Sequence, residues 1–465
     1  MATAVLDDRA AEKSSLDRLL GLAAEVRPGE ATTALLLGLN GFLILAAYYV
    51  IRPLRSAFLL PVRIVLPGGG VLTGAEITSY SGAALAALFL FIVPLYGNLA
   101  SKVNRIRLIN GVTLFFVSNL MVFFLLGQAG VPPGVLGVPF FLWIGIFNLV
   151  VVAQFWSFTN DVYTPEQGQR LFALVGFGAM TGAIAGPLIN ASLIGRLGEF
   201  PLMLVAGGIL LVCLLLTNVI HIRERDRAAD RRSQRQAGQP LGREGGFQLV
   251  LGQRYLLLIG LLTLAGQLVN TNGNYILNET LTQMARAAVA NGSAGTLSQG
   301  QIIGSYYAVT DFWQNLLGVV IQFFLVSRIF KYLGVGRALF ILPAIALGSY
   351  GLFAAAPVLA LIRIAKIGEN ATDYSLQNTV RRALFLPTSR EAKYKALNAV
   401  ETFFWRAGDM LSAVATLVLV QWLGLGVRSY AALNLGIVLV WMLVAVSLSR
   451  ENRNLTSEAP VTTAA

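Results

Sequence analysis

Residues 31–51 read ATTALLLGLNGFLILAAYYVI, an apolar stretch with no charged side chain that ends directly before Arg52. An α-helix needs about 20 predominantly apolar residues to cross the hydrocarbon core of a bilayer. The stretch meets that length, so it predicts a membrane-spanning helix. Stretches of the same kind recur along the rest of the chain, and their number decides the fold.

The composition is typical of a membrane protein over the whole length. Of the 465 residues, 56% are hydrophobic and 12% are charged, whereas soluble domains carry about 25% charged residues. We therefore predict an all-α polytopic membrane protein with twelve transmembrane helices. The spans are expected near residues 31–51, 75–97, 107–128, 136–160, 171–194, 200–222, 254–278, 302–327, 337–356, 358–380, 399–423 and 429–449.

The basic residues indicate how these helices are oriented. The N-terminus and every second connection hold 26 of the 35 Lys and Arg residues, against 6 on the opposite side. Because Lys and Arg accumulate in cytoplasmic connections, both termini are expected in the cytoplasm. The first 30 residues are polar and show no cleavable signal peptide, so the first span is expected to serve as the insertion signal.

The chain also contains a weak internal repeat. Residues 49–52 (YVIR) and 275–278 (YILN) lie 226 positions apart, and at the same offset residues 99–102 (LASK) resemble 325–328 (LVSR). The matches predict two pseudo-symmetric six-helix bundles, as in major-facilitator-type transporters. The expected organisation is a cytoplasmic N-terminal segment (1–30), an N-terminal bundle (31–222), a basic cytoplasmic linker (223–253), a C-terminal bundle (254–450) and a polar cytoplasmic tail (451–465).

Polar side chains are distributed unevenly among the spans. The third, sixth, ninth and twelfth spans have uncharged interiors, whereas the tenth carries polar residues at every third or fourth position. Because a charge in hydrocarbon costs ~2.5–3.5 kcal/mol, such groups are expected to face a watery cavity between the bundles. Guanidinium groups there suit a phosphate or carboxylate. The candidate substrate-binding residues are Arg52, Arg55, Asn160, Asn274, Asn278, Lys366, Asn370 and Arg406.

The acidic residues in and beside the spans have a second predicted role, in gating or proton coupling. The candidates are Glu76, Asp161, Glu279, Asp311, Glu369, Asp373, Glu401 and Asp409. A structural alternative is that the charges pair among themselves, Arg363 with Glu369 or Asp373, and Arg406 with Asp409. Gly178 and Gly182 in the fifth span are interpreted as helix-packing positions, because small residues let helices approach closely.

Other classes of function find no support. Cys213 is the only cysteine and His221 the only histidine, so neither a disulfide framework nor a Cys/His metal site can form. No Walker A sequence, HExxH motif, nucleophile elbow or dinucleotide fingerprint is present, and we expect neither catalysis nor a cofactor. The basic residues lie in short connections, which fits lipid headgroups and not a nucleic acid polymer. The expected partners are membrane lipids and a small anionic solute, and the chain is expected to be a monomer.

A group of longer motifs points to a known family. They are RPGE (27–30), YYVIRPLR (48–55), AEI (75–77), FWSFTND (155–161), TPEQGQRLF (164–172), YKA (394–396) and RAGD (406–409). Together they resemble the ATP:ADP antiporter (nucleotide transporter) family of plastids and intracellular bacteria, and more closely its relatives in free-living bacteria. The resemblance implies a twelve-helix, major-facilitator-like carrier that exchanges nucleotides across a bacterial inner membrane. It also implies that Arg406 occupies the family's basic position in the eleventh span.

Three hypotheses for function follow. The first is a secondary-active transporter that exchanges a nucleotide-like or other anionic phosphorylated metabolite by alternating access. The second is a proton-coupled carrier of a drug, lipid or peptide, with the acidic residues as proton carriers. The third is a membrane scaffold or receptor that does not transport, because a fold does not fix a function.

Overall fold

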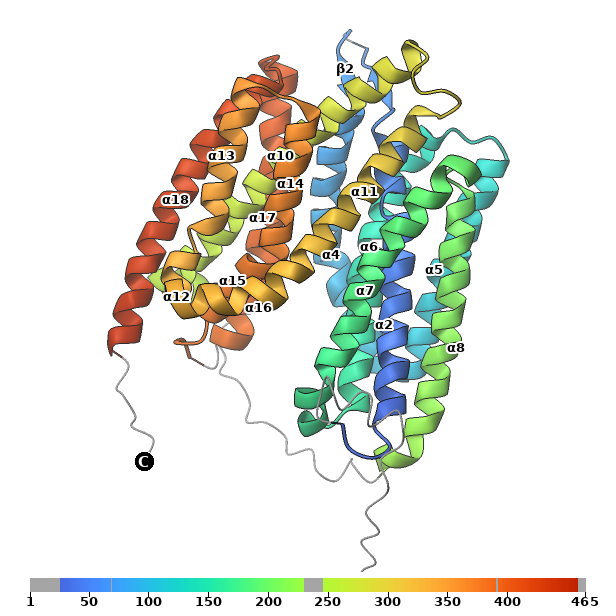
Figure 1. Ribbon diagram of the computed structural model, residues 1–465, viewed down its shortest axis with the longest axis vertical. Helices are drawn as coiled ribbons and strands as arrows, with labels where there is room; N and C mark the ends of the chain where they lie inside the picture. The colour runs from blue at the N-terminus through green and yellow to red at the C-terminus, as the bar shows by residue number, and fades with distance from the viewer. Residues whose placement is uncertain (1–25, 68, 230–245, 390–391, 459–465) are drawn as a thin grey trace, which may run out of the picture.

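The computed structural model describes residues 26–67, 69–229, 246–389 and 392–458. Within these ranges the chain is almost entirely helical, which confirms the predicted all-α polytopic fold. We refer to residues 26–229 as the N-terminal half and to residues 246–458 as the C-terminal half. The two halves lie side by side (Figure 1).

The N-terminal half begins with a span that is broken near its end. Its helices are α2 (Ala31–Ile51), α3 (Leu54–Leu59), α4 (Gly74–Lys102), α5 (Arg105–Gln128), α6 (Pro133–Val162), α7 (Pro165–Leu197) and α8 (Pro201–Ala229). The break between α2 and α3 falls at Pro53, which has no backbone N–H to continue the helical ladder. Strands β1 (Arg63–Val65) and β2 (Val71–Thr73) pair antiparallel in a hairpin before α4.

The C-terminal half is built of helices that π-helical turns join into longer spans. Its helices are α9 (Gly246–Gly252), α10 (Arg254–Ala290), α11 (Gln299–Val320), α12 (Val326–Ala338), α13 (Ile341–Ala355), α14 (Leu359–Thr372), α15 (Asn378–Leu384), α16 (Leu397–Ala399), α17 (Trp405–Thr416) and α18 (Val427–Glu458). The π-helical turns are Ile321–Leu325, Asp373–Gln377, Ala392–Ala396, Val400–Phe404 and Leu417–Trp422. As a result α11 and α12 form one span, as do α14 and α15.

Ten helices of the described chain are long and apolar enough to cross a membrane. The other two expected spans are also helical but miss these criteria for different reasons. The ninth span is α13, which has only 15 residues. The tenth span, α14 with α15, carries the polar stripe that the sequence shows at this place. The twelve expected spans therefore each correspond, in order, to a helix or a pair of joined helices.

Two polar segments are more helical than the sequence analysis predicts. In the basic linker, α8 continues to Ala229 and α9 begins at Gly246, and the stretch between them lies outside the described residues. In the expected polar tail, α18 continues to Glu458, because residues 451–459 contain neither Gly nor Pro. Residues 1–25 also lie outside the described residues.

The ends of the spans define two faces of the molecule. The termini face is the end at which α2 begins and α18 ends, and the far face is the opposite end, which carries the β1–β2 hairpin. Figure 1 shows the far face at the top. The helices of the two halves converge toward the far face and diverge toward the termini face.

Each half has its own apolar core. The core of the N-terminal half includes a stack of aromatic rings. The ring centroid of Trp143 lies 5.6 Å from that of Phe140 and 5.8 Å from that of Phe147. The core of the C-terminal half takes in only Leu60 and Ala75 from the other half. The buried apolar clusters thus stay almost entirely within one half, and the halves meet where α11 packs against α3 and α7 and where α4 packs against α10 and α17.

Glycines bring α7 into backbone contact with α2. A Cβ added at Gly178 would lie 2.2 Å from the carbonyl oxygen of Gly38, and one at Gly182 would lie 2.1 Å from that of Phe42. The two contacts are spaced four residues apart on both helices, so they form one continuous seam. This geometry confirms the interpretation of Gly178 and Gly182 as packing positions.

We expect Gly182→Val to destabilise the protein strongly, because the new side chain meets fixed backbone of α2. Overpacking of this kind costs typically about 1–3 kcal/mol and occasionally more. The check is the thermal midpoint of the purified protein in detergent. Gly208→Val is the matched control, since a Cβ at Gly208 in α8 meets nothing within 4 Å. Equal midpoints for the two variants would contradict the packing account.

Candidate functional site

The two halves meet in an ion pair inside the membrane-spanning region. Arg52, directly after α2, places Nη1 3.0 Å from Oδ1 of Asp311 in α11. The two side chains are 15% and 6% exposed, so the pair is largely shielded from solvent. Removing one partner of such a pair is costly, because the other is left as an uncompensated buried charge. The pair therefore links the halves at a defined place.

Neutral hydrogen bonds reinforce this link. Tyr49 donates to Oδ1 of Asn315 at 3.4 Å, and Asn315 donates to the carbonyl oxygen of Ala183 at 2.7 Å. The guanidinium of Arg52 also lies over the ring of Tyr49, 5.2 Å from its centroid. Through these contacts α11 of the C-terminal half is bonded to both α2 and α7 of the N-terminal half.

Further contacts between the halves lie at the far face. Gln421, at the end of the eleventh span, donates to the carboxylate of Glu76 at the start of α4. Ser298 donates to Oε1 of Glu199 at 3.1 Å, and Gln301 donates to a backbone carbonyl at the end of α7. These bonds hold the two halves together on the side where their helices converge in Figure 1.

Lys366 is enclosed within the C-terminal half. Its Nζ donates to Oε2 of Glu369 at 2.9 Å and to Oδ1 of Asn270 at 3.0 Å, and its side chain is 0% exposed. Tyr350 donates to the same carboxylate oxygen at 3.2 Å. In this conformation the charge of Lys366 is balanced by Glu369, and its side chain does not reach the space between the halves. Its role in substrate binding therefore stays a prediction.

Arg406 stands at the border between the halves. Its Nη1 lies 3.3 Å from Oδ2 of Asp409, which confirms the predicted pairing, and its guanidinium lies 4.6 Å from the ring centroid of Phe89 in α4. Asp409 also accepts hydrogen bonds from Gln267 at 2.7 Å and from Thr271 at 2.8 Å. With its side chain 35% exposed, Arg406 keeps part of its charge accessible.

A chain of amide side chains crosses three helices of the C-terminal half. Asn274 donates to Asn270 at 3.3 Å, Asn270 donates to Asn370 at 3.1 Å, and Asn370 donates to Gln314 at 3.0 Å. The chain begins at the exposed Asn274 on α10 and ends on α11. The structure thus joins two predicted substrate-binding residues, Asn274 and Asn370, in one network.

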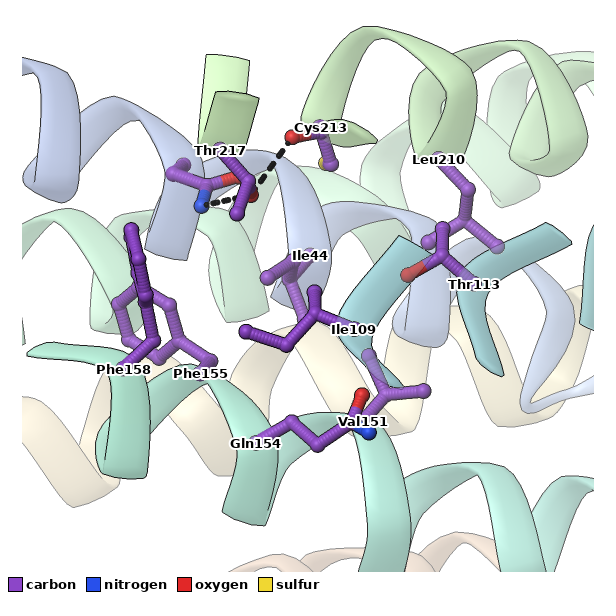
Figure 2. A pocket seen from close by; sticks show the side chains of 11 residues that line it. Ile44, Ile109, Thr113, Val151, Gln154, Phe155, Phe158, Leu210, Cys213 and Thr217 are labelled. Atoms are coloured by element: carbon purple, nitrogen blue, oxygen red, sulfur yellow. Dashed lines mark hydrogen bonds between the residues drawn. The ribbon is translucent and has the colours of Figure 1, made fainter. Parts of the chain in front are cut away.

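The corresponding part of the N-terminal half has an uncharged lining (Figure 2). A pocket of about 20 Å³ lies there between α2, α5, α6 and α8, and Asn40 donates to Thr217 across it at 3.0 Å. In the C-terminal half, a pocket of about 10 Å³ is lined by Glu369 and Asp373 among others. Because one water needs about 10–15 Å³, neither space holds a solute. The linings of these two pockets therefore differ in charge.

Two motifs of the family resemblance meet at the termini face. Glu30 accepts hydrogen bonds at 3.0 Å from both terminal nitrogens of Arg170 and from the Gln167 amide. Burial alone would raise the pKa of Glu30, but these hydrogen bonds and one from the backbone of Arg27 outweigh it and lower the pKa below its usual value. RPGE and TPEQGQRLF therefore tie the start of α2 to the start of α7.

Other predicted site residues are paired locally. Arg105 pairs with Asp161 at the termini face. Glu279 accepts from Gln283 one turn along α10 at 3.0 Å. Asn278 is buried and accepts a hydrogen bond from Tyr307. None of these three contacts links the two halves.

The remaining predicted residues are spread along the spans. Arg55 lies over the ring of Phe141, 5.2 Å from its centroid, and Asn160 is exposed in the last turn of α6. Glu401 lies 4.0 Å from Arg382 on an exposed surface. Asn160 and Arg52 lie near opposite ends of their half, so the predicted set does not form a single cluster in this conformation.

The predicted pairing of Arg363 with Glu369 or Asp373 is wrong. Lys366 bonds to Glu369, and Arg381 lies 3.8 Å from Asp373. Arg363 points instead toward α11, where its Nε donates to Oγ1 of Thr310 at 3.1 Å. The sequence gives spacing along one helix, but it does not show which side of that helix faces the bundle interior.

Some partners of the site residues escape the sequence analysis. Gln421, which holds Glu76, gives only a weak signal as one polar residue at the end of the run LVLVQW. Tyr350, which bonds to Glu369, lies in a span whose interior carries no charged residue. Arg381, the partner of Asp373, also escapes it, although its place eight residues after Asp373 puts both near one helix face and is a signal that could have found it.

Comparison of the sequence with protein-family models and with curated proteins gives no match. The fold, in contrast, is similar to that of solved transporters over nearly the whole chain. A bacterial homolog of the human lysosomal transporter Spinster, in an inward-facing and unoccupied conformation, is 13% identical with a TM-score of 0.56, covering 93% of this chain and 98% of its own.

Two further structures give the same picture. The POT family transporter PepTSo is 12% identical with a TM-score of 0.59, covering 92% of this chain and 99% of its own. The nucleoside transporter NupG is 14% identical with a TM-score of 0.59, and the match covers 91% of this chain and 99% of NupG. At these identities the similarity establishes a shared all-α polytopic membrane fold.

Proposed function

We propose that the chain is a secondary-active transporter that moves a small anionic solute by alternating access, with its two halves rocking about the Arg52–Asp311 contact. The observation that carries the proposal is the fold, which covers more than nine-tenths of the chain in three solved transporters. The separate cores of the halves and the contacts gathered toward the far face support it. In such carriers one half moves against the other around a site near the middle of the bilayer.

We further propose that the solute carries a phosphate, in keeping with the resemblance to the ATP:ADP antiporter family. Arg52 and Arg406 are the side chains suited to hold it, because a guanidinium binds phosphate oxygens in bidentate fashion. Each is paired with a single aspartate, Asp311 or Asp409, which an incoming anion would compete with. The amide chain that ends at Asn274 offers uncharged hydrogen-bond donors for the rest of the solute.

The proposed setting is the inner membrane of a bacterium with the termini face in the cytoplasm. The excess of basic residues on that side supports this orientation. The contacts between halves at the far face then correspond to a state closed toward the outside. NupG, whose fold this chain shares, is a nucleoside transporter, which supports a nucleotide-like solute as the first to test.

Counterflow into proteoliposomes tests the proposal. Vesicles are loaded with unlabelled ATP, ADP, a hexose phosphate or inorganic phosphate, and uptake of the labelled compound is measured. We expect uptake only when the vesicles contain a phosphorylated compound. The rate of uptake should fall about tenfold in Arg406→Gln, because one charge-assisted hydrogen bond to the solute is removed. Arg428→Gln removes an exposed arginine at the far face and should leave uptake unchanged. Failure of every phosphorylated solute to exchange would overturn the proposal.

A proton-coupled carrier is the second candidate, and one observation favours it. Oε1 of Glu369 is buried without a hydrogen-bond partner in the described chain, close to the buried carboxylate of Asp373. Acidic residues buried within a spanning bundle often mark proton relays. Uptake driven by a pH gradient into vesicles without internal solute, and lost in Glu369→Gln, would establish this candidate in place of exchange.

A further inference from the structure

A groove on the C-terminal half lies apart from the contacts between the halves. It has a volume of about 740 Å³ and runs between α11 and α14, which diverge toward the far face in Figure 1. This volume falls in the range of about 300–1,000 Å³ that is typical of ligand-binding pockets. The groove is therefore large enough to hold a ligand, unlike the small pockets inside the bundles.

The walls of the groove are apolar along most of their length. α11 contributes Val309, Trp313 and Leu317, and α14 contributes Ile364 and Ile367, among others. The three residues of α11 are four apart, so they form one stripe along the helix. Trp313 and Ile364 are 51% and 68% exposed. A surface of this kind suits a hydrocarbon chain that lies along the helices.

One charged residue, Arg363, interrupts this lining. Its guanidinium lies over the ring of Tyr306, 4.4 Å from the centroid, and its Nε donates to Thr310. Its Nη2 is buried and has no hydrogen-bond partner in the described part of the chain. In the same ranges no carboxylate lies within 4.0 Å of it, whereas Lys366 and Arg381, the buried basic residues of the same span, are paired with Glu369 and Asp373.

Arg363 lies close to the far-face end of α14. It lies four residues after Leu359, where α14 begins at the far face, which is about 6 Å along a helix axis. Arginines near the ends of spanning helices extend toward the interface and meet lipid phosphates there. The groove below Arg363 continues toward the middle of the membrane.

We propose that this groove binds an anionic phospholipid of the far-face leaflet, with the headgroup phosphate at Arg363 and an acyl chain along Trp313 and Ile367. The unpaired guanidinium supplies the charge complementarity, and the apolar stripes of α11 and α14 supply the surface for the chain. Because α11 also carries Asp311, a lipid bound here contacts the helix that links the two halves. The site is independent of which solute the carrier moves.

Fluorescence quenching by brominated lipids tests this site in the full-length chain. Leu317→Cys is made in a Cys213→Ala background, labelled with bimane, and reconstituted in phosphatidylcholine vesicles with increasing fractions of dibrominated phosphatidylglycerol or dibrominated phosphatidylcholine. We expect half-maximal quenching at about a fivefold lower fraction of the anionic lipid, the effect of one basic residue at a membrane surface. Arg363→Gln should abolish this preference, and Arg428→Gln should retain it.

Three results would overturn the proposal. The first is equal quenching by the two lipids with Arg363 intact, a comparison that needs no folded Arg363 variant. The second is an undiminished preference in Arg363→Gln. The third is loss of the preference when inorganic phosphate replaces chloride at constant ionic strength, which would assign Arg363 to a soluble anion and not to a lipid.

Discussion

Oxidation of the double variant Ala57→Cys/Gly304→Cys is expected to abolish transport. A Cβ built at Gly304 in α11 lies 3.4 Å from the Cβ of Ala57 in α3, at the short edge of the ~3.5–4.5 Å that disulfides span. The bond would join the halves at the far face, where they must part for the site to open to that side. The measurement is counterflow in a Cys213→Ala background, before and after oxidation.

The loss of transport should follow the fraction of protein that is cross-linked and should reverse with a reducing agent. Each single-cysteine variant is a control, since oxidation leaves it without a bond between the halves. Only the end of the Ile194 side chain must move to accommodate a side chain at Gly304, so the variants should fold. Full transport by completely cross-linked protein would refute the rocking movement.

The second large effect is expected from Lys366→Ala, as a loss of stability. The substitution leaves Glu369, 3% exposed, as a buried carboxylate without its cation. Breaking one side of a buried pair costs about 3–5 kcal/mol, whereas replacing both partners by neutral groups of similar size is often nearly neutral. The double variant Lys366→Met/Glu369→Gln should therefore recover much of the loss, as measured by thermal midpoints in detergent.

The matched control for this cycle is Arg382→Ala. Arg382 pairs with Glu401 at 4.0 Å, but its side chain is 66% exposed, and exposed pairs contribute about 0–1 kcal/mol. A midpoint for Lys366→Ala near that of Arg382→Ala would contradict the buried-pair account. So would a double variant that is no more stable than Lys366→Ala.

The spans could be predicted from sequence because the bilayer sets their length. The stretch that decides the fold, residues 31–51, was located to the residue as α2, since apolarity alone defines it. The breaks within spans were not predicted. The π-helical turn Asp373–Gln377 and the continuation of the first span beyond Pro53 as α3 depend on packing against neighbouring helices.

For the candidate site, the sequence identified the residues better than their partners. Arg406 and Asp409 were paired correctly because they are three residues apart on one helix. Arg52 and Asp311 were named separately, and nothing in the chain shows that side chains 259 positions apart meet. Lys366 was expected to face a solute, but the face of a helix that turns inward is set by the assembled bundle.

Distances between spin labels on opposite halves test the central claim most directly. One labelled pair, Lys102→Cys with Lys331→Cys, reports on the termini face, and the other, Leu197→Cys with Thr296→Cys, reports on the far face, both in a Cys213→Ala background. All four positions are exposed, and each pair spans the two halves. When the exchanged solute is added, the far-face distance should lengthen while the termini-face distance shortens. Distances that stay unchanged, or that lengthen at both faces together, would contradict a carrier whose halves rock about a shared site.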